Sequence, residues 1–212
     1  MPRPPAVAAA LALSLCLLPS GAGAQVPWES PRMTATDAPG GPSLFYARFS
    51  SLPGAGLGGL LLWQPSGLPA GVSLRAGGAR GAGGELAGFG GIDVSAPLVR
   101  RSQEMPLDLS WSTGIGLGAG DYLLLTLPVG VTAGRGLSSG QVWLHPWAGV
   151  HAVMDGRVGG NAPDDEFEVS PSAELGLDVA FDRRRRVVLR GAASLGDRSA
   201  FVVGVALGEG VP

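Results

Sequence analysis

A run of strict alternation constrains the fold of this chain more than any other feature. Between Leu107 and Leu117 nearly every second residue is apolar, and the pattern restarts at Leu123 and continues to Ala133. A period of two is typical of a β-strand, because successive side chains point to opposite faces of the sheet. Both runs reach the roughly 9–11 residues that a strand needs to cross a bilayer. The pattern therefore predicts long strands with one apolar face.

The beginning of the chain has the pattern of a secretory signal peptide, residues 1–24. Arg3 precedes an apolar stretch from Ala6 to Leu18, and small residues then lead to Ala24. Such a segment is removed on export, so we expect cleavage after Ala24 and a mature chain that begins at Gln25. The apolar stretch is shorter than the roughly 20 residues of a membrane-spanning helix, which argues against an anchor.

The composition of the mature chain excludes several kinds of chemistry. It contains neither cysteine nor lysine, which removes disulfides, thiol catalysis, lysine Schiff bases and the lysine of a phosphate-binding loop. The formal net charge of the full chain is −2 at pH 7 and no basic stripe accumulates, so we expect no nucleic acid as a partner. No later apolar stretch is long enough for a membrane helix. A membrane-embedded mature chain would therefore have to be a closed β-barrel.

Ten segments of the mature chain show strand-like alternation. They predict an all-β, antiparallel, up-and-down transmembrane β-barrel of about ten strands over residues 43–208, with eight strands as the alternative. Residues 25–42 are interpreted as a flexible periplasmic leader and residues 209–212 as a C-terminal tail. The predicted strands are Ser43–Leu52, Gly56–Gln64, Gly71–Ala79, Glu85–Leu98, Leu107–Leu117, Leu123–Ala133, Gln141–Met154, Ser172–Asp182, Val187–Gly196 and Ala200–Gly208.

In most of these segments one face is apolar, and the other carries glycine, serine, threonine and scattered charges. Alternation alone does not distinguish inside from outside, because a soluble barrel with an apolar interior has the same period. Two features favour an apolar exterior: the apolar face carries no charge, and the opposite face is rich in glycine, which suits a narrow interior. The residues expected to face lipid include Leu109, Trp111, Leu125, Val129, Val131, Val203 and Val205.

The polar face would then line the interior of the barrel. Unpaired charges are costly in a narrow interior, so we expect these side chains to pair across strands as a structural network. A small pore lined by carboxylates is the alternative. The charged residues concerned are Arg48, Arg75, Glu85, Asp93, Asp108, Glu174, Asp178 and Arg190.

The connections between strands predict an orientation. In an even-stranded barrel both termini lie on the periplasmic side, where turns are short, and the longer loops lie outside the cell. The polar segment Asp155–Pro171 is therefore predicted as an external loop, and the turn Asp182–Arg186 as a periplasmic turn. We interpret the four arginines of that turn as a solvated run rather than a specific anion site.

The two histidines give little support to catalysis or metal binding. His145 and His151 share one face of the seventh segment, about 20 Å apart on a regular strand, which is too far for one metal ion. No motif places a nucleophile beside either of them, so a Ser-His-Asp arrangement in the barrel wall is not favoured. Trp143 and Trp147 flank His145 and fit an aromatic girdle or an interior plug. We expect no catalytic residue, metal site or cofactor.

Five short strand and turn segments carry a family resemblance: Phe89–Val94, Pro106–Ser110, Leu127–Val131, His145–Trp147 and Gly196–Arg198. Together they span most of the mature chain, which resembles the small bacterial outer-membrane β-barrel proteins, chiefly the uncharacterised ones of about this length. The resemblance implies an outer-membrane location, with membrane lipid and the barrel-assembly machinery as partners, and no shared reaction. The last strand departs from the family pattern, because Gly208–Pro212 follows Leu207 where an aromatic residue commonly ends the chain.

These observations predict an outer-membrane β-barrel with a structural or interaction role and no catalysis. One alternative is a narrow passive pore for small solutes or ions. A further alternative is a soluble periplasmic, lipocalin-like binding barrel whose apolar face points inward. The three hypotheses differ in what the two faces of the strands contact.

Overall fold

The structure is a computed structural model that describes residues 41–49, 57–64, 69, 71–80, 86–120, 122–159, 167–196 and 200–208. The predicted signal peptide, most of the predicted leader, the predicted tail and Glu85 lie outside these residues. Residues 41–49 and 57 are described in their backbone alone, so the side chain of Arg48 is also outside the description.

The described part of the chain consists of β-strands joined by short connections. All pairings between strands are antiparallel, which confirms the predicted all-β antiparallel fold. The strands are β1 (Gly41–Phe49), β2 (Leu57–Gln64), β3 (Val72–Arg80), β4 (Leu86–Val99), β5 (Asp108–Ala119), β6 (Leu123–Gly134), β7 (Leu137–Ser139), β8 (Val142–Val158), β9 (Phe167–Ala180), β10 (Val187–Gly196) and β11 (Ala200–Leu207).

Among the described residues, no helix is long and apolar enough to cross a membrane.

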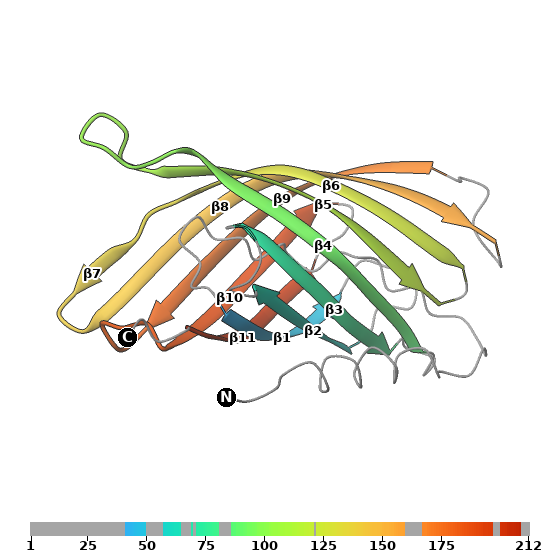
Figure 1. Ribbon diagram of the computed structural model, residues 1–212, viewed down its shortest axis with the longest axis horizontal. Coiled ribbons are helices and arrows are strands. Elements are labelled where there is room, and N and C mark those ends of the chain that lie inside the picture. The colour runs from blue at the N-terminus through green and yellow to red at the C-terminus, as the bar shows by residue number, and fades with distance from the viewer. Residues whose placement is uncertain are drawn as a thin grey trace.

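The strand pairings return to their starting point and form a ring (Figure 1). Strands that follow one another pair side by side, except β6 and β7; β1 pairs with β11, and β6 pairs with β8. Over the described residues the ring contains ten strands, since the three-residue β7 pairs only with β8 and extends one rim. Closure leaves the ten-stranded ring without a free edge, and each strand of the ring pairs with a neighbour on both sides.

The register of the ring sets the tilt of the strands. Following directly paired residues from His145 on β8 around the ring leads back to β8 at Arg157, twelve residues further along the strand. With a rise of about 3.3 Å per residue and about 4.8 Å between strands, this stagger gives a tilt of about 40°. The 12-residue strands β5 and β6 then extend roughly 30 Å along the barrel axis.

Most of the large apolar side chains point outward. On β6 the alternation is complete: Val129 is 48% exposed, whereas Thr126 and Thr132, of the opposite parity, are buried. The predicted lipid-facing residues are all on the outer face; Leu109 and Trp111 are half-buried there, and the exposed ones are Leu125, Val129, Val131, Val203 and Val205.

The interior is layered. One buried apolar cluster lies near one end of the ring, where Trp143 packs with Ala180, Val188 and Ala206. A second cluster, further along the axis, includes Trp147, Phe89, Leu60 and Val202 among its members. On β8, β9 and β10 the residues between the two clusters are polar, so the apolar layers enclose a polar one.

The connection between β8 and β9 is shorter than predicted, and the boundary prediction for Asp155–Pro171 as a loop is wrong. β8 continues to Val158 and β9 begins at Phe167. Asp155 is 1% exposed because it faces the interior. A polar residue that faces the inside of a barrel is indistinguishable in sequence from a loop residue, which explains the error.

Inward-facing glycines receive the large side chains of neighbouring strands. Gly176 on β9 is paired with Trp147 on β8, and a Cβ at Gly176 would collide with the Trp147 indole. Gly77 on β3 is paired with Phe89 on β4, and a Cβ there would collide with the phenyl ring. These glycines are therefore required for space rather than for an unusual backbone conformation.

We predict that Gly176→Ala lowers the free energy of unfolding by about 1–3 kcal/mol, because the added methyl group overpacks against Trp147. The measurement is urea-induced unfolding followed by tryptophan fluorescence. Gly191→Ala on the adjacent β10 is the matched control, since a Cβ at Gly191 would meet nothing within 4 Å. Equal effects of the two substitutions would contradict the packing role of Gly176.

Candidate functional site

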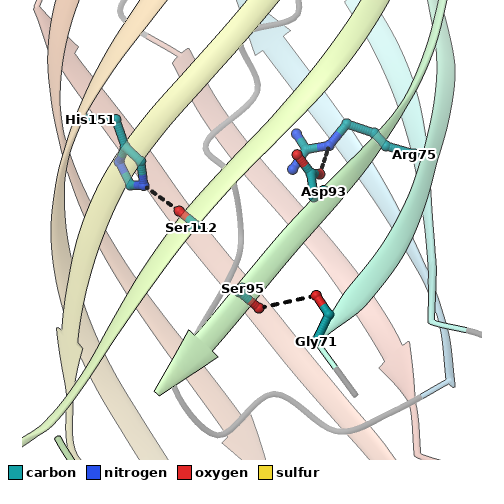
Figure 2. A network of polar contacts seen from close by, with 6 residues as sticks. All are labelled: Gly71, Arg75, Asp93, Ser95, Ser112 and His151. Atoms are coloured by element: carbon teal, nitrogen blue, oxygen red, sulfur yellow. Dashed lines mark hydrogen bonds and ion pairs between the residues drawn. The ribbon is translucent and has the colours of Figure 1, made fainter. Parts of the chain in front are cut away.

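The candidate site is a set of buried polar side chains that point into the barrel. Figure 2 shows one part of it, where Arg75 on β3 reaches Asp93 on β4. The Arg75 Nε donates to Asp93 Oδ2 at 2.8 Å, and both side chains are at most 1% exposed. Nearby, the Ser95 hydroxyl donates to the carbonyl of Gly71 at 3.4 Å.

A second buried ion pair joins β9 to β10. Asp178 and Arg190 are direct partners in the register, and Arg190 donates from Nε and Nη2 to Asp178 Oδ2 at 2.9 and 2.8 Å. His145 on β8 is the partner of Asp178 on the other side and is fully buried. Its ring stacks on Trp143, with 5.4 Å between ring centroids. The Arg185 guanidinium lies 4.1 Å from the Trp143 ring centroid.

A third group contains a serine, a histidine and a carboxylate from three strands. Ser112 Oγ on β5 lies 3.4 Å from His151 Nε2 on β8 (Figure 2), and His151 Nδ1 lies 3.6 Å from Glu174 Oε1 on β9. The imidazole lies over Gly130 on β6, the strand between Ser112 and His151, where any Cβ would collide with the ring. The absence of a side chain at Gly130 allows His151 to reach Ser112.

The order Ser112, His151, Glu174 is that of a nucleophile, a base and an orienting acid. Two features of the surroundings argue for a structural link instead. Ser112 is only 2% exposed, so a substrate has no contact with its hydroxyl in this conformation. It is also in mid-strand, paired with Ser95 on one side and Gly130 on the other. The sheet therefore uses the backbone N–H groups that an oxyanion hole would need.

A fourth polar group lies toward the end of the barrel that holds the β8–β9 connection. Arg157 on β8 forms an ion pair with Glu168 on β9, and the Ser170 hydroxyl donates to Glu168 Oε1 at 2.9 Å. Asp155 faces the interior between this pair and the Ser112 group, opposite Thr126 on β6. Polar groups thus occur along much of the length of the interior.

The structure brings together most of the charged residues singled out in the sequence. Five of them are buried in the interior: Arg75, Asp93, Glu174, Asp178 and Arg190. Asp108 lies apart from these five, at the start of β5, where it is half-buried and accepts a hydrogen bond from the backbone N–H of Arg101 at 2.8 Å. Arg48 and Glu85 are not described at the side-chain level.

Sequence reasoning missed the contacts of the interior histidines. The parity of β8 places both on the inner face, as the alternation indicates. The contacts of His151 with Ser112 and Glu174 depend on how β8 pairs with its neighbours, which no local pattern reveals, whereas Trp143 lies two residues from His145 on the same face of β8. The register pair of Gly130 with His151 is the nearest available signal, and it can be recognised only when the strand pairing is known.

Comparisons with known proteins identify no family for this chain. No protein-family model matches the chain, and no curated protein matches it either. Within the described residues, no group of three or more His, Cys, Asp or Glu side chains could hold a metal ion.

We predict that Asp178→Asn lowers the free energy of unfolding by about 3–5 kcal/mol, because it leaves the buried Arg190 charge without its carboxylate partner. The double variant Asp178→Leu with Arg190→Met should recover most of this loss, since both charges are then removed. Both values come from urea unfolding of the refolded protein.

The control for this prediction is Asp182→Asn. Asp182 and Arg186 form an exposed Arg–Asp pair in the β9–β10 turn, with 2.9 Å between Arg186 Nε and Asp182 Oδ2. Solvent screens that pair, so little change in stability is expected. Similar losses in Asp178→Asn and Asp182→Asn would show that the interior pair is not tightly coupled.

Proposed function

We propose that this chain is a membrane-embedded β-barrel of the bacterial outer membrane, with a structural or interaction role and no catalysis. Export through a cleaved signal peptide and insertion by the barrel-assembly machinery belong to the same proposal. The observation that carries it is the polarity of the wall: large apolar side chains are exposed on the strands from β4 to β11, and charged ones are buried inside the ring.

The extent of the apolar exterior supports lipid as its partner. Soluble monomers rarely expose apolar patches larger than a few hundred Å². Here exposed leucine, valine, isoleucine and phenylalanine side chains occur on neighbouring strands from β4 to β11. The estimated axial length of β5 and β6, roughly 30 Å, is about the thickness of the hydrocarbon core of a bilayer.

The same polarity argues against the soluble, lipocalin-like alternative. That hypothesis needs an apolar interior for the ligand and a polar exterior in water. The interior of this barrel instead contains two Arg–Asp pairs, Arg75–Asp93 and Arg190–Asp178, and two histidines. Buried charges of this kind are costly in an apolar binding cavity.

The packing of the interior favours a structural role over a pore. An open channel would leave the charged groups of its wall in contact with water. Asp93, Asp178 and Glu174 are each at most 4% exposed, and two of these carboxylates are neutralised by arginine. Trp143 and Trp147 fill the interior rather than contribute to an aromatic girdle.

We predict that Val129→Arg lowers the stability of the refolded barrel in lipid vesicles by about 2–4 kcal/mol, because it places a charge near the middle of the apolar exterior. The measurement is urea unfolding in phosphatidylcholine vesicles, together with the mobility difference between heated and unheated samples on a gel. Leu137→Arg, on β7 at the rim, is the control, with an expected cost of about 0–1 kcal/mol.

A soluble barrel predicts little change in stability for Val129→Arg. Val129 is exposed, and an arginine on a water-facing surface usually changes stability by less than about 0.5 kcal/mol. A wild-type protein that folds as a monomer in detergent-free buffer, with Val129→Arg harmless, would refute membrane embedding.

Ion conductance of the refolded protein in a planar bilayer distinguishes the structural role from the hypothesis of a pore. We expect the refolded protein to be silent, because its interior is packed with paired side chains. Steady conductance that changes in Glu174→Gln would instead support a pore. Asp108→Asn is the control, since Asp108 lies apart from the buried interior pairs.

A further inference from the structure

Arginines gather at one end of the barrel, in the connections that span residues 100–107, 135–141 and 181–186. These connections join β4 to β5, β6 to β8 and β9 to β10, so antiparallel pairing places them at the same end of the ring, on the left in Figure 1. By sequence they contain seven arginines and two carboxylates, in a chain whose net charge is −2. We call these seven residues the arginine rim: Arg100, Arg101, Arg135, Arg183, Arg184, Arg185 and Arg186.

Hydrogen bonds hold the three connections beside one another. The Arg101 Nη1 donates to the carbonyl of Gly136 at 3.0 Å, which ties the β4–β5 connection to the β6–β8 connection. The Arg183 Nε donates to the carbonyl of Gly140 at 3.3 Å, which ties the β9–β10 turn to the same connection. The three connections that carry the arginine rim are therefore joined to one another along one side of the barrel end, and are not independent loops.

Several guanidinium groups of the rim have no carboxylate partner among the described residues. Asp182 binds Arg186, and this hydrogen bond holds the pKa of the Asp182 carboxyl below its ordinary value, so that carboxylate stays ionised and engaged. Arg100, Arg135 and Arg184 are exposed and form no ion pair with a described carboxylate. They are available to an external anion.

The arginine rim adjoins the apolar exterior. Val99, Leu107, Phe181 and Val187, which flank the rim arginines in the sequence, are all at least 36% exposed. Leu137 lies within the middle connection and is exposed as well. If the exterior is in lipid, the guanidinium groups lie where hydrocarbon gives way to water, which is the level of the lipid phosphates.

We propose that the arginine rim binds the phosphate groups of anionic phospholipids in the surrounding membrane. The inference rests on the proposed function, because it needs the apolar exterior to be in a bilayer. Guanidinium binds phosphate with two parallel charge-assisted hydrogen bonds, which makes arginine well suited to this ligand. The fixed arc of arginines presents several such groups to neighbouring headgroups at once.

The test uses the full mature chain refolded in zwitterionic detergent micelles and titrated with phosphatidylglycerol or phosphatidylcholine. Native mass spectrometry counts the bound lipid molecules. We expect phosphatidylglycerol to bind at least tenfold more tightly, and each of Arg100→Gln, Arg135→Gln and Arg184→Gln to weaken it about fivefold. Added salt should reduce the preference.

Arg80→Gln is the matched control, because Arg80 is an exposed arginine at the opposite end of β3 from the rim. Equal binding of the two lipids, or an equal loss in Arg80→Gln and Arg135→Gln, would overturn the proposal. Displacement of phosphatidylglycerol by inorganic phosphate at constant ionic strength would indicate a free-anion site and would overturn the lipid assignment.

A separate measurement distinguishes failure of the lipid-binding proposal from failure of the proposed membrane-embedded barrel. The triple variant of Arg100, Arg135 and Arg184 is refolded into neutral phosphatidylcholine vesicles, and its gel mobility with and without heating is recorded. If the triple variant inserts but the wild type shows no preference for phosphatidylglycerol, the proposal that the arginine rim binds anionic lipid is refuted, and the membrane-embedded barrel is not. Failure of the wild type to insert refutes the membrane-embedded barrel itself.

Discussion

Backbone hydrogen bonds between β6 and β8, and between β11 and β1, close the sheet into a ring, and the rest of the structure depends on that closure. A closed ring gives each strand partners on both sides, the arrangement that a strand structure needs in an environment without water. Closure with a stagger of twelve residues also determines which side chains meet inside. The contact between Ser112 and His151 depends on this closure, whereas the interior ion pairs join strands that follow one another in the chain.

The interior is built by matching large side chains to glycines on the adjacent strand. His151 lies over Gly130, and Trp147 lies over Gly176. This solution allows a narrow barrel to contain rings and ion pairs without widening. It also limits what the interior can do: Ser112 and His151 are held in contact, but the packing that positions them removes the space that a substrate would need.

Charge is distributed in two ways in this barrel, and the two have different consequences. Inside, each of Arg75 and Arg190 is paired with an aspartate, and these two pairs hold neighbouring strands together. At the rim, Arg100, Arg135 and Arg184 are exposed and form no ion pair with any described carboxylate. Removing one partner of a buried ion pair destabilises a structure, whereas unpaired positive charges at a lipid boundary attract anions.

The period of two determined much of the fold from the sequence alone, because a strand must alternate its side chains. Leu125 and Val129 were placed on the outer face, and Arg75, Asp93, Asp178 and Arg190 on the inner face, from parity and the distribution of charge. The partner of each inward residue was not determined in this way. Asp108 has the parity of the interior but lies at the rim, and Asp155 resembles a loop residue but belongs to the wall.

Only the tertiary structure decided those positions, since they depend on where each strand begins and on the stagger of the closed ring. It also brought the run Arg183–Arg186, which in the sequence is a solvated turn, beside Gly140, in the same connection that Arg101 contacts at Gly136. Local alternation reports the face of a residue. Long-range pairing alone sets its height along the barrel and its neighbours.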